Sequence, residues 1–144
     1  MISGLTDADS LPVLERMMQF ASRRQRLLAD AVANFDTPGH RPLDVSVTDF
    51  QSALGEAVDE RRERHSARGG ALPLASTDEV RVAGDRLELT PGEANANVLF
   101  HDENDRDLDR AMQALAENVM TMRTMTTLHR SRMDLLASAL RERP

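Results

Sequence analysis

The side chains best suited to chemistry are four histidines and one acidic run, and they are scattered along the chain. His40, His65, His101 and His129 are each isolated, and none has a second histidine at the spacing of a metal site. The 144 residues include no cysteine, which excludes disulfides, thiolate catalysis and cysteine-based metal centres. The sequence therefore predicts no metal site built on these side chains.

The acidic run 102–107 superficially resembles a calcium-binding loop. An EF-hand needs Gly at the sixth position and Glu at the twelfth, where this chain has Asp107 and Gln113. We interpret the run as charges at a helix start, where carboxylates interact favourably with the helix dipole. No glycine-rich phosphate loop, serine nucleophile elbow or paired-carboxylate motif is present. We expect no enzyme and no cofactor.

Composition narrows the class of protein further. The formal net charge of −6 makes a nucleic-acid partner a poor expectation. Only 3% of the residues are aromatic, while methionine is abundant at 8, and such a composition suits helix-on-helix packing. The N-terminal residues do not resemble a cleavable secretory signal, and no stretch approaches the roughly 20 apolar residues of a membrane helix. The sequence predicts no membrane insertion.

A heptad pattern predicts a helix over about residues 10–34, which would be roughly 36 Å long. Ser10 is a plausible N-cap, and Pro12 falls in the first turn, where its missing N–H costs nothing. The apolar positions of this pattern, the N-terminal seam, are Leu11, Leu14, Met18, Ala21, Leu28 and Val32, with Gln25 as a polar break. A second apolar set beside it is Met17, Phe20, Leu27 and Ala31.

A second heptad pattern predicts a helix over about residues 105–141, which would be roughly 55 Å long. Its C-terminal seam is Leu108, Met112, Leu115, Val119, Met122, Thr126, His129, Met133, Leu136 and Leu140. We interpret the polar pair Thr126 and His129 as fixing register or finding a partner in an assembly, rather than as a metal site. A helix of this length must bury its seam against the N-terminal helix or against other chains.

The middle of the chain has weaker patterns. Apolar and polar residues alternate over 43–47, which indicates a strand or an extended arm. A helix is expected over 50–64, capped by Thr48 or Asp49. A hairpin is expected within 78–90, broken at 84–85, and 65–104 reads as the least rigid region. The expected fold is mainly α, with long N- and C-terminal heptad helices packing as a coiled coil or bundle. A short extended or β-hairpin segment lies between them.

One short motif stands between the first helix and the rest of the chain. Its residues are Ala33, Asn34, Phe35, Asp36, Thr37, Pro38, Gly39 and His40. Pro38 cannot continue a helix, Gly39 supplies the positive φ that the third residue of a type II turn needs, and Asn34 suits a helix C-terminus. Local physics predicts a helix stop followed by a sharp turn. The chain thus divides into 1–34, 35–104 and 105–144.

Three blocks of sequence resemble the proximal-rod proteins of the bacterial flagellar basal body, of the FlgB type. The first is 24–39, with its Ala-Asn-x-x-Thr-Pro-Gly core, and the second is 43–50, which ends in Phe50. The third is 104–118, at the start of the C-terminal helix. His40 stands where the family usually has Tyr, and Arg106 and Ala111 replace the usual Val and Glu. The change to His40 removes an aromatic anchor after the turn.

The resemblance implies a structural protein of the basal-body rod. Such proteins are exported unfolded through the flagellar type III apparatus and assemble helically, with both terminal helices in an inner tube. The implied partners are other rod proteins, the membrane-embedded ring with its adaptor protein, and further copies of the chain. Because the middle looks poorly cored, we expect neighbours to cover the seams and the isolated chain to be partly folded or self-associated. We also expect the turn to aim 41–50 sideways, towards neighbouring subunits.

A different class of protein shares the heptads. A soluble cytoplasmic helical adaptor, or a bundle like a secretion chaperone, would also have two long amphipathic helices. That alternative gives no reason for the Thr-Pro-Gly motif.

Overall fold

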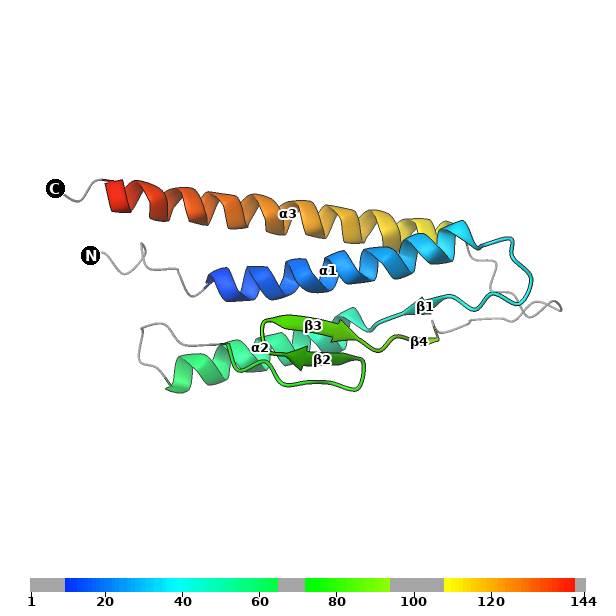
Figure 1. The fold of residues 1–144 in the computed structure, drawn as a ribbon, viewed down its shortest axis with the longest axis horizontal. Helices are drawn as coiled ribbons and strands as arrows, with labels where there is room; N and C mark the ends of the chain where they lie inside the picture. Colours follow the sequence, from blue (N-terminus) through cyan, green and yellow to red (C-terminus); the bar gives the residue numbers. More distant parts are fainter. Residues whose placement is uncertain (1–9, 65–71, 94–107, 142–144) are drawn as a thin grey trace.

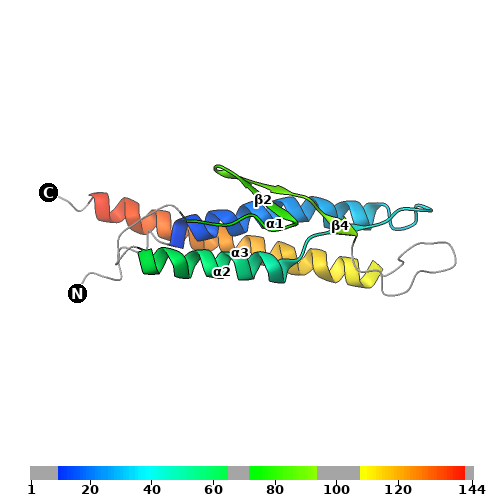
Figure 2. The same cartoon turned by 90° about the horizontal axis from the view of Figure 1, so that it is seen from below.

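The computed structural model describes residues 10–64, 72–93 and 108–141, and it is mainly helical, as predicted. Within these residues three helices extend along one common axis (Figures 1 and 2). Helix α3 forms one side of the molecule, α1 lies in the middle, and α2 with the strands forms the other side (Figure 1). Helix α1 is therefore covered on two faces.

The two long helices are α1, Ser10–Ala33, and α3, Leu108–Arg141. They agree with the predicted spans except for 105–107, which lie outside the described residues. The helices are antiparallel (Figure 1), so Asn118 contacts α1 at Ala21, while Thr126, further along α3, lies against Met18. Helix α1 has 24 residues and α3 has 34, so α1 is too short to cover the whole of α3.

The predicted helix stop and turn are both present. Asn34 closes α1 by donating from its backbone N to Asp30 O, and its side-chain Nδ2 donates to the same carbonyl. The next turn has Gly39 at φ 77° and a hydrogen bond of 3.1 Å from His40 N to Thr37 O. These are the features of a type II turn with Pro38 and Gly39 at its centre.

The arm that leaves this turn folds back along its own chain, and its contact with neighbouring subunits stays a prediction. Strand β1, Leu43–Asp44, runs back along α1 and pairs antiparallel with β4, Gly92–Glu93 (Figure 1). Val45 is buried, and the ring of Phe50 stacks on that of Phe20 in α1, with centroids 4.0 Å apart. Burial of these apolar side chains holds the arm on its own helix.

Helix α2, Val47–Arg64, begins three residues before the predicted start. Its cap is Ser46 rather than Thr48 or Asp49, because Ser46 Oγ accepts a hydrogen bond from Asp49 N at 3.2 Å. The free N–H of Ser46 donates to Glu79 Oε2 at 2.6 Å. A carboxylate from a distant segment therefore completes this cap, which local sequence cannot reveal.

The predicted hairpin consists of β2, Val80–Ala83, and β3, Arg86–Leu89, joined at Gly84 and Asp85. Val80 pairs with Leu89, and Ala83 pairs with Arg86. Two residues of α1 hold its turn, since Arg16 donates to Gly84 O and Gln19 donates to Asp85 O, each at 2.9 Å.

The main hydrophobic core lies between α1 and the middle layer, and this corrects the expectation of a poorly cored middle. Its buried members are Phe20, Val45, Phe50, Leu54, Ala57, Leu74, Val80 and Leu87. Met17 and Leu27, from the second apolar set of α1, pack against it. The expectation failed because these core residues are few and widely separated in the sequence. Of the region 65–104, only 72–93 is described, and it contributes Leu74, Val80 and Leu87.

The turn offers a clear test of backbone strain. A Cβ at Gly39 would meet nothing within 4 Å, so only the positive φ penalises a side chain there. We expect Gly39→Val to lower the free energy of unfolding by about 1–3 kcal/mol, since β-branched residues are poorly tolerated at positive φ. Gly39→Asn is the matched control, because Asn tolerates this conformation better. Urea denaturation measures both, and equal midpoints for the two variants would contradict the strain argument.

Candidate functional site

Of the residues considered for chemistry, His40 and His129 are described, and they lie in separate contacts. Among the described residues, no group of three or more His, Cys, Asp or Glu side chains could hold a metal ion. His40 Nε2 lies 3.7 Å from Asp30 Oδ2, and His129 Nε2 lies 3.8 Å from Glu15 Oε1. His65, His101 and the acidic run 102–107 lie outside the described residues. The candidate site is therefore a set of packing surfaces.

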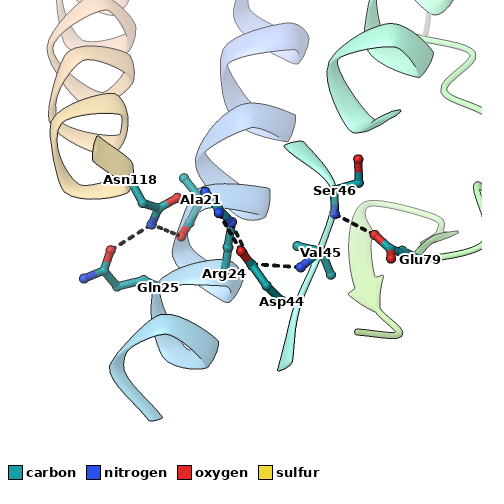
Figure 3. A network of polar contacts seen from close by, with 8 residues as sticks. All are labelled: Ala21, Arg24, Gln25, Asp44, Val45, Ser46, Glu79 and Asn118. Carbon is teal, nitrogen blue, oxygen red and sulfur yellow. Dashed lines mark hydrogen bonds and ion pairs between the residues drawn. The ribbon is translucent and has the colours of Figure 1, made fainter. Parts of the chain in front are cut away.

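The contact between α1 and α3 is organised by one buried amide. Asn118 is 5% exposed, and its Nδ2 donates to Ala21 O at 2.9 Å and to Gln25 Oε1 at 2.8 Å (Figure 3). Gln25, the polar break in the N-terminal seam, thus finds its partner on α3. Because a buried polar group is costly in any other register, this pair specifies how the two helices align.

A second polar contact attaches the arm to α1. The guanidinium of Arg24 binds the carboxylate of Asp44 with two hydrogen bonds, of 2.7 Å from Nε and 2.6 Å from Nη2 (Figure 3). Both side chains are largely buried, and Asp44 Oδ1 also accepts from Val45 N at 2.8 Å. With the Glu79–Ser46 bond, this forms a continuous polar path from α1 through the arm to the segment before β2 (Figure 3).

A groove lies beside this path, where the motif, the arm, α1 and α3 meet. Its volume is about 420 Å³, and its walls include Phe35 and Pro42 after α1, Leu28 on α1, and Leu108 and Ala111 on α3. Arg24 and Asp44 lie in the same lining, so the ion pair forms part of one wall. The motif therefore shapes a surface shared by both long helices.

The N-terminal seam faces α3 at several points. Met18 and Ala21 contact α3 residues directly, and Leu14 and Leu28 are buried. The remaining seam residues, Leu11 and Val32, are half-buried. Of the motif, Ala33, Asp36, Thr37, Pro38 and Gly39 are exposed, while Asn34 and His40 are half-buried.

The C-terminal seam divides into two groups. The half-buried group is Leu108, Leu115, Val119, Met122, Thr126, His129 and Leu136, while Met112, Met133 and Leu140 are exposed. Asn118 is the only buried residue within the described α3. Leu140 is 72% exposed. One α1 helix thus covers only part of the apolar surface that α3 presents.

Sequence reasoning missed several of these residues. Asn118 lies one position before Val119 of the predicted seam, and its polar nature hid its burial. The partnership of Arg24 with Asp44 had no local signal, because 20 residues separate them. Three exposed apolar residues of α3 outside the seam, Met120, Leu128 and Leu135, were also not singled out. Their roughly seven-residue spacing was the available clue.

None of the described helices combines the length and the apolar character needed to cross a membrane. No family model matches the chain. The chain is 30% identical over 110 residues to the flagellar basal body rod protein FlgB of Salmonella typhimurium, covering 72% of each chain. It is 29% identical over 109 residues to FlgB of Escherichia coli, covering 72% of each. It is 25% identical over 135 residues to FlgB of Yersinia enterocolitica, covering 89% of this chain and 90% of the relative.

The buried amide can be tested by truncation. We expect Asn118→Ala to lower the free energy of unfolding by about 1–3 kcal/mol, because Gln25 loses its partner and a void is left. Gln113→Ala is the matched control on α3, since its exposed side chain bonds the exposed Glu117, and it should change stability by less than about 0.5 kcal/mol. Thermal or urea unfolding measures both. Equal effects would show that Asn118 does not lock the helices together.

A double-mutant cycle tests the ion pair. Arg24→Met and Asp44→Asn each remove one partner, and the cycle should give a coupling free energy of about 1–2 kcal/mol. The estimate exceeds that of a surface pair because two hydrogen bonds join largely buried groups. As an internal reference, the exposed Arg62–Asp59 pair should couple by only about 0.5 kcal/mol. A coupling for Arg24–Asp44 no larger than that reference would contradict its role in holding the arm.

Proposed function

Because this chain belongs to the family of FlgB-like flagellar basal body rod proteins, we propose that it is a non-enzymatic structural subunit of the rod. We infer export through the flagellar type III apparatus and helical assembly, with α1 and α3 in the inner tube. In this position it connects the membrane-embedded ring to the rest of the rod. Its partners are other rod proteins, the ring with its adaptor protein, and further copies of itself.

The observation that carries this proposal is the uncovered apolar surface of α3. Met112, Met133 and Leu140 belong to the predicted seam and remain exposed in the single chain. Large apolar side chains concentrated along one helix are typical of a surface that a partner covers. In an assembly, neighbouring helices bury these side chains.

The length difference between the helices supports the same proposal. His129 lies near Glu15 close to the start of α1, so the last two to three turns of α3 extend past the described part of α1. Leu135 and Leu140 are exposed on this overhang. A helix end of this kind suits contact with the next subunit along the rod.

The fold also changes the role proposed for the motif. Since the arm folds back on α1, the motif acts inside the subunit by joining α1 to the middle layer. The seams of α1 and α3 remain the proposed assembly surface. We propose that the protein is located in the flagellar basal body, in the part of the rod that lies outside the cytoplasmic membrane.

Gene deletion tests this function against the cytoplasmic adaptor. Deletion should abolish rods and filaments, and the wild-type gene supplied in trans should restore them. An epitope-tagged chain should co-purify with basal bodies, which a cytoplasmic adaptor would not do. Electron microscopy of basal bodies and swimming assays give the readout. Normal rods and motility in the deletion strain would sink the proposal.

A further inference from the structure

Helix α3 has an outer face that α1 does not touch. Its members are Met120, Thr124, Leu128, Ser131, Leu135 and Ser138, all exposed and none charged. Their spacing of three and four residues places them along one side of the helix. Residues of α3 that contact α1, such as Asn118 and Thr126, lie on a different side. The helix therefore has a second uncharged surface besides its seam.

The hydroxyl groups of two threonines in this region are bonded within the helix. Thr124 Oγ1 donates to Met120 O at 3.0 Å, and Thr127 Oγ1 donates to Arg123 O at 3.0 Å. Such bonds leave the threonine methyl groups available for packing and satisfy the hydroxyl donors. Burying these threonines against a partner therefore costs less than their polar nature suggests.

A groove on the opposite side of the molecule matches this face. It runs between α1 and α2 and has a volume of about 350 Å³. Its lining combines apolar or small residues with the polar Gln51 and the charged pair Asp59 and Arg62; the former are Val13, Met17, Leu54, Gly55 and Val58. A Cβ at Gly55 would meet nothing within 4 Å, so open space lies directly over the helix backbone. The groove can accept a row of projecting side chains such as Met120 and Leu128.

Both surfaces have charges beside them, and two rows of these charges are complementary. Asp134 lies next to the outer face, and Asp59 and Arg62 in the groove pair with each other. Arg123 and Arg130 are exposed, seven residues apart, and flank the outer face of α3. Asp49, Glu56 and Glu63 are exposed along α2, also seven residues apart. Seven residues span roughly 10.5 Å on any α-helix, so the two rows have the same repeat. Interhelical ion pairs of this kind select partner and orientation in packed helices.

We propose that the outer face of α3 docks into the α1–α2 groove of a second copy of this chain. Arg123 and Arg130 of one copy then lie beside Glu56 and Glu63 of the next. Because α3 and α2 lie on opposite sides of α1 (Figure 1), the contact joins two unlike surfaces. Repeated contacts of unlike surfaces build rings or open helices, whereas a like-to-like contact closes a dimer. The proposal rests on the assembly role argued above and names the partner surface.

The lack of native cysteine allows a direct test by cross-linking. Purified Leu128→Cys and Gly55→Cys variants, mixed under mild oxidation, should give a disulfide-linked dimer at least about tenfold faster than either variant alone. Replacing Gly55→Cys with Glu88→Cys, exposed on the hairpin, is the matched control and should give no such gain. Rapid dimerisation of Leu128→Cys alone would show that α3 faces pair with each other. That result, or no cross-link in the mixture, overturns the proposal.

Self-association measured without cross-linking tests the groove and the charges separately. In sedimentation velocity, Gly55→Trp should fill the groove and weaken self-association by about tenfold or more, while Gly55→Ala should leave it unchanged. The double variant Arg123→Glu with Arg130→Glu should associate weakly alone but regain association when mixed with Glu56→Arg with Glu63→Arg. Circular dichroism confirms that each variant folds. Undiminished association of Gly55→Trp, or no recovery in the charge-exchanged mixture, overturns the proposal.

The tests of this docking mode can fail independently of the test of the rod function. If the groove variants behave like wild type while the deletion strain lacks rods, only the docking mode is wrong. If the cross-link forms but the deletion strain has normal rods, only the rod function is wrong.

Discussion

Burial of α1 on two faces is the constraint on which the rest of the structure depends. One face presents Met18, Ala21 and Gln25 to α3. Another presents Met17, Phe20 and Leu27 to the core of the middle layer. The stacked rings of Phe20 and Phe50, 3° from parallel, join that core to the start of α2. A helix covered on both sides must be apolar around much of its circumference, which explains why the second apolar set lies beside the seam.

Polar contacts decide how these layers align, because apolar faces alone tolerate several registers. The amide of Asn118 binds α1 at a single place, and the Arg24–Asp44 pair fixes the arm at another, only three residues further along α1 than Ala21. The two anchors lie on different sides of the same helical turns (Figure 3). A shift of α3 along α1 would leave the buried amide of Asn118 without its hydrogen-bond partners. A shift of the arm would separate the largely buried Arg24 and Asp44. Alignment of all three layers is therefore specified around residues 21–25 of α1.

Features controlled by neighbouring residues were predictable from the sequence, and those controlled by distant contacts were not. Heptad spacing located both long helices, and Pro38 with Gly39 located the turn. Alternation interrupted at Gly84 located the hairpin. The cap of α2 was assigned to the wrong residue, although the bond from Asp49 N to Ser46 Oγ is local; the bond from Ser46 N to Glu79, 33 residues away, had no local signal. The course of the arm along α1 was not foreseen because it depends on contacts with Arg24 and with Phe20. Similarly, periodicity located the seam of α3, but it could not say how much of that seam α1 covers.

The division of surfaces separates folding from assembly. The core around Phe50 and Leu87 belongs to α1 and the middle layer, so those elements have buried contacts without any neighbouring subunit. Helix α3 contributes no residue to that buried cluster, and its attachment depends on Asn118 and half-buried side chains. It is the element of the described chain with the most apolar surface left uncovered. In the proposed assembly, the middle layer stays as it is in the single chain while neighbouring subunits cover α3. Such an assembly would add burial to α3 without rebuilding the core that positions α1.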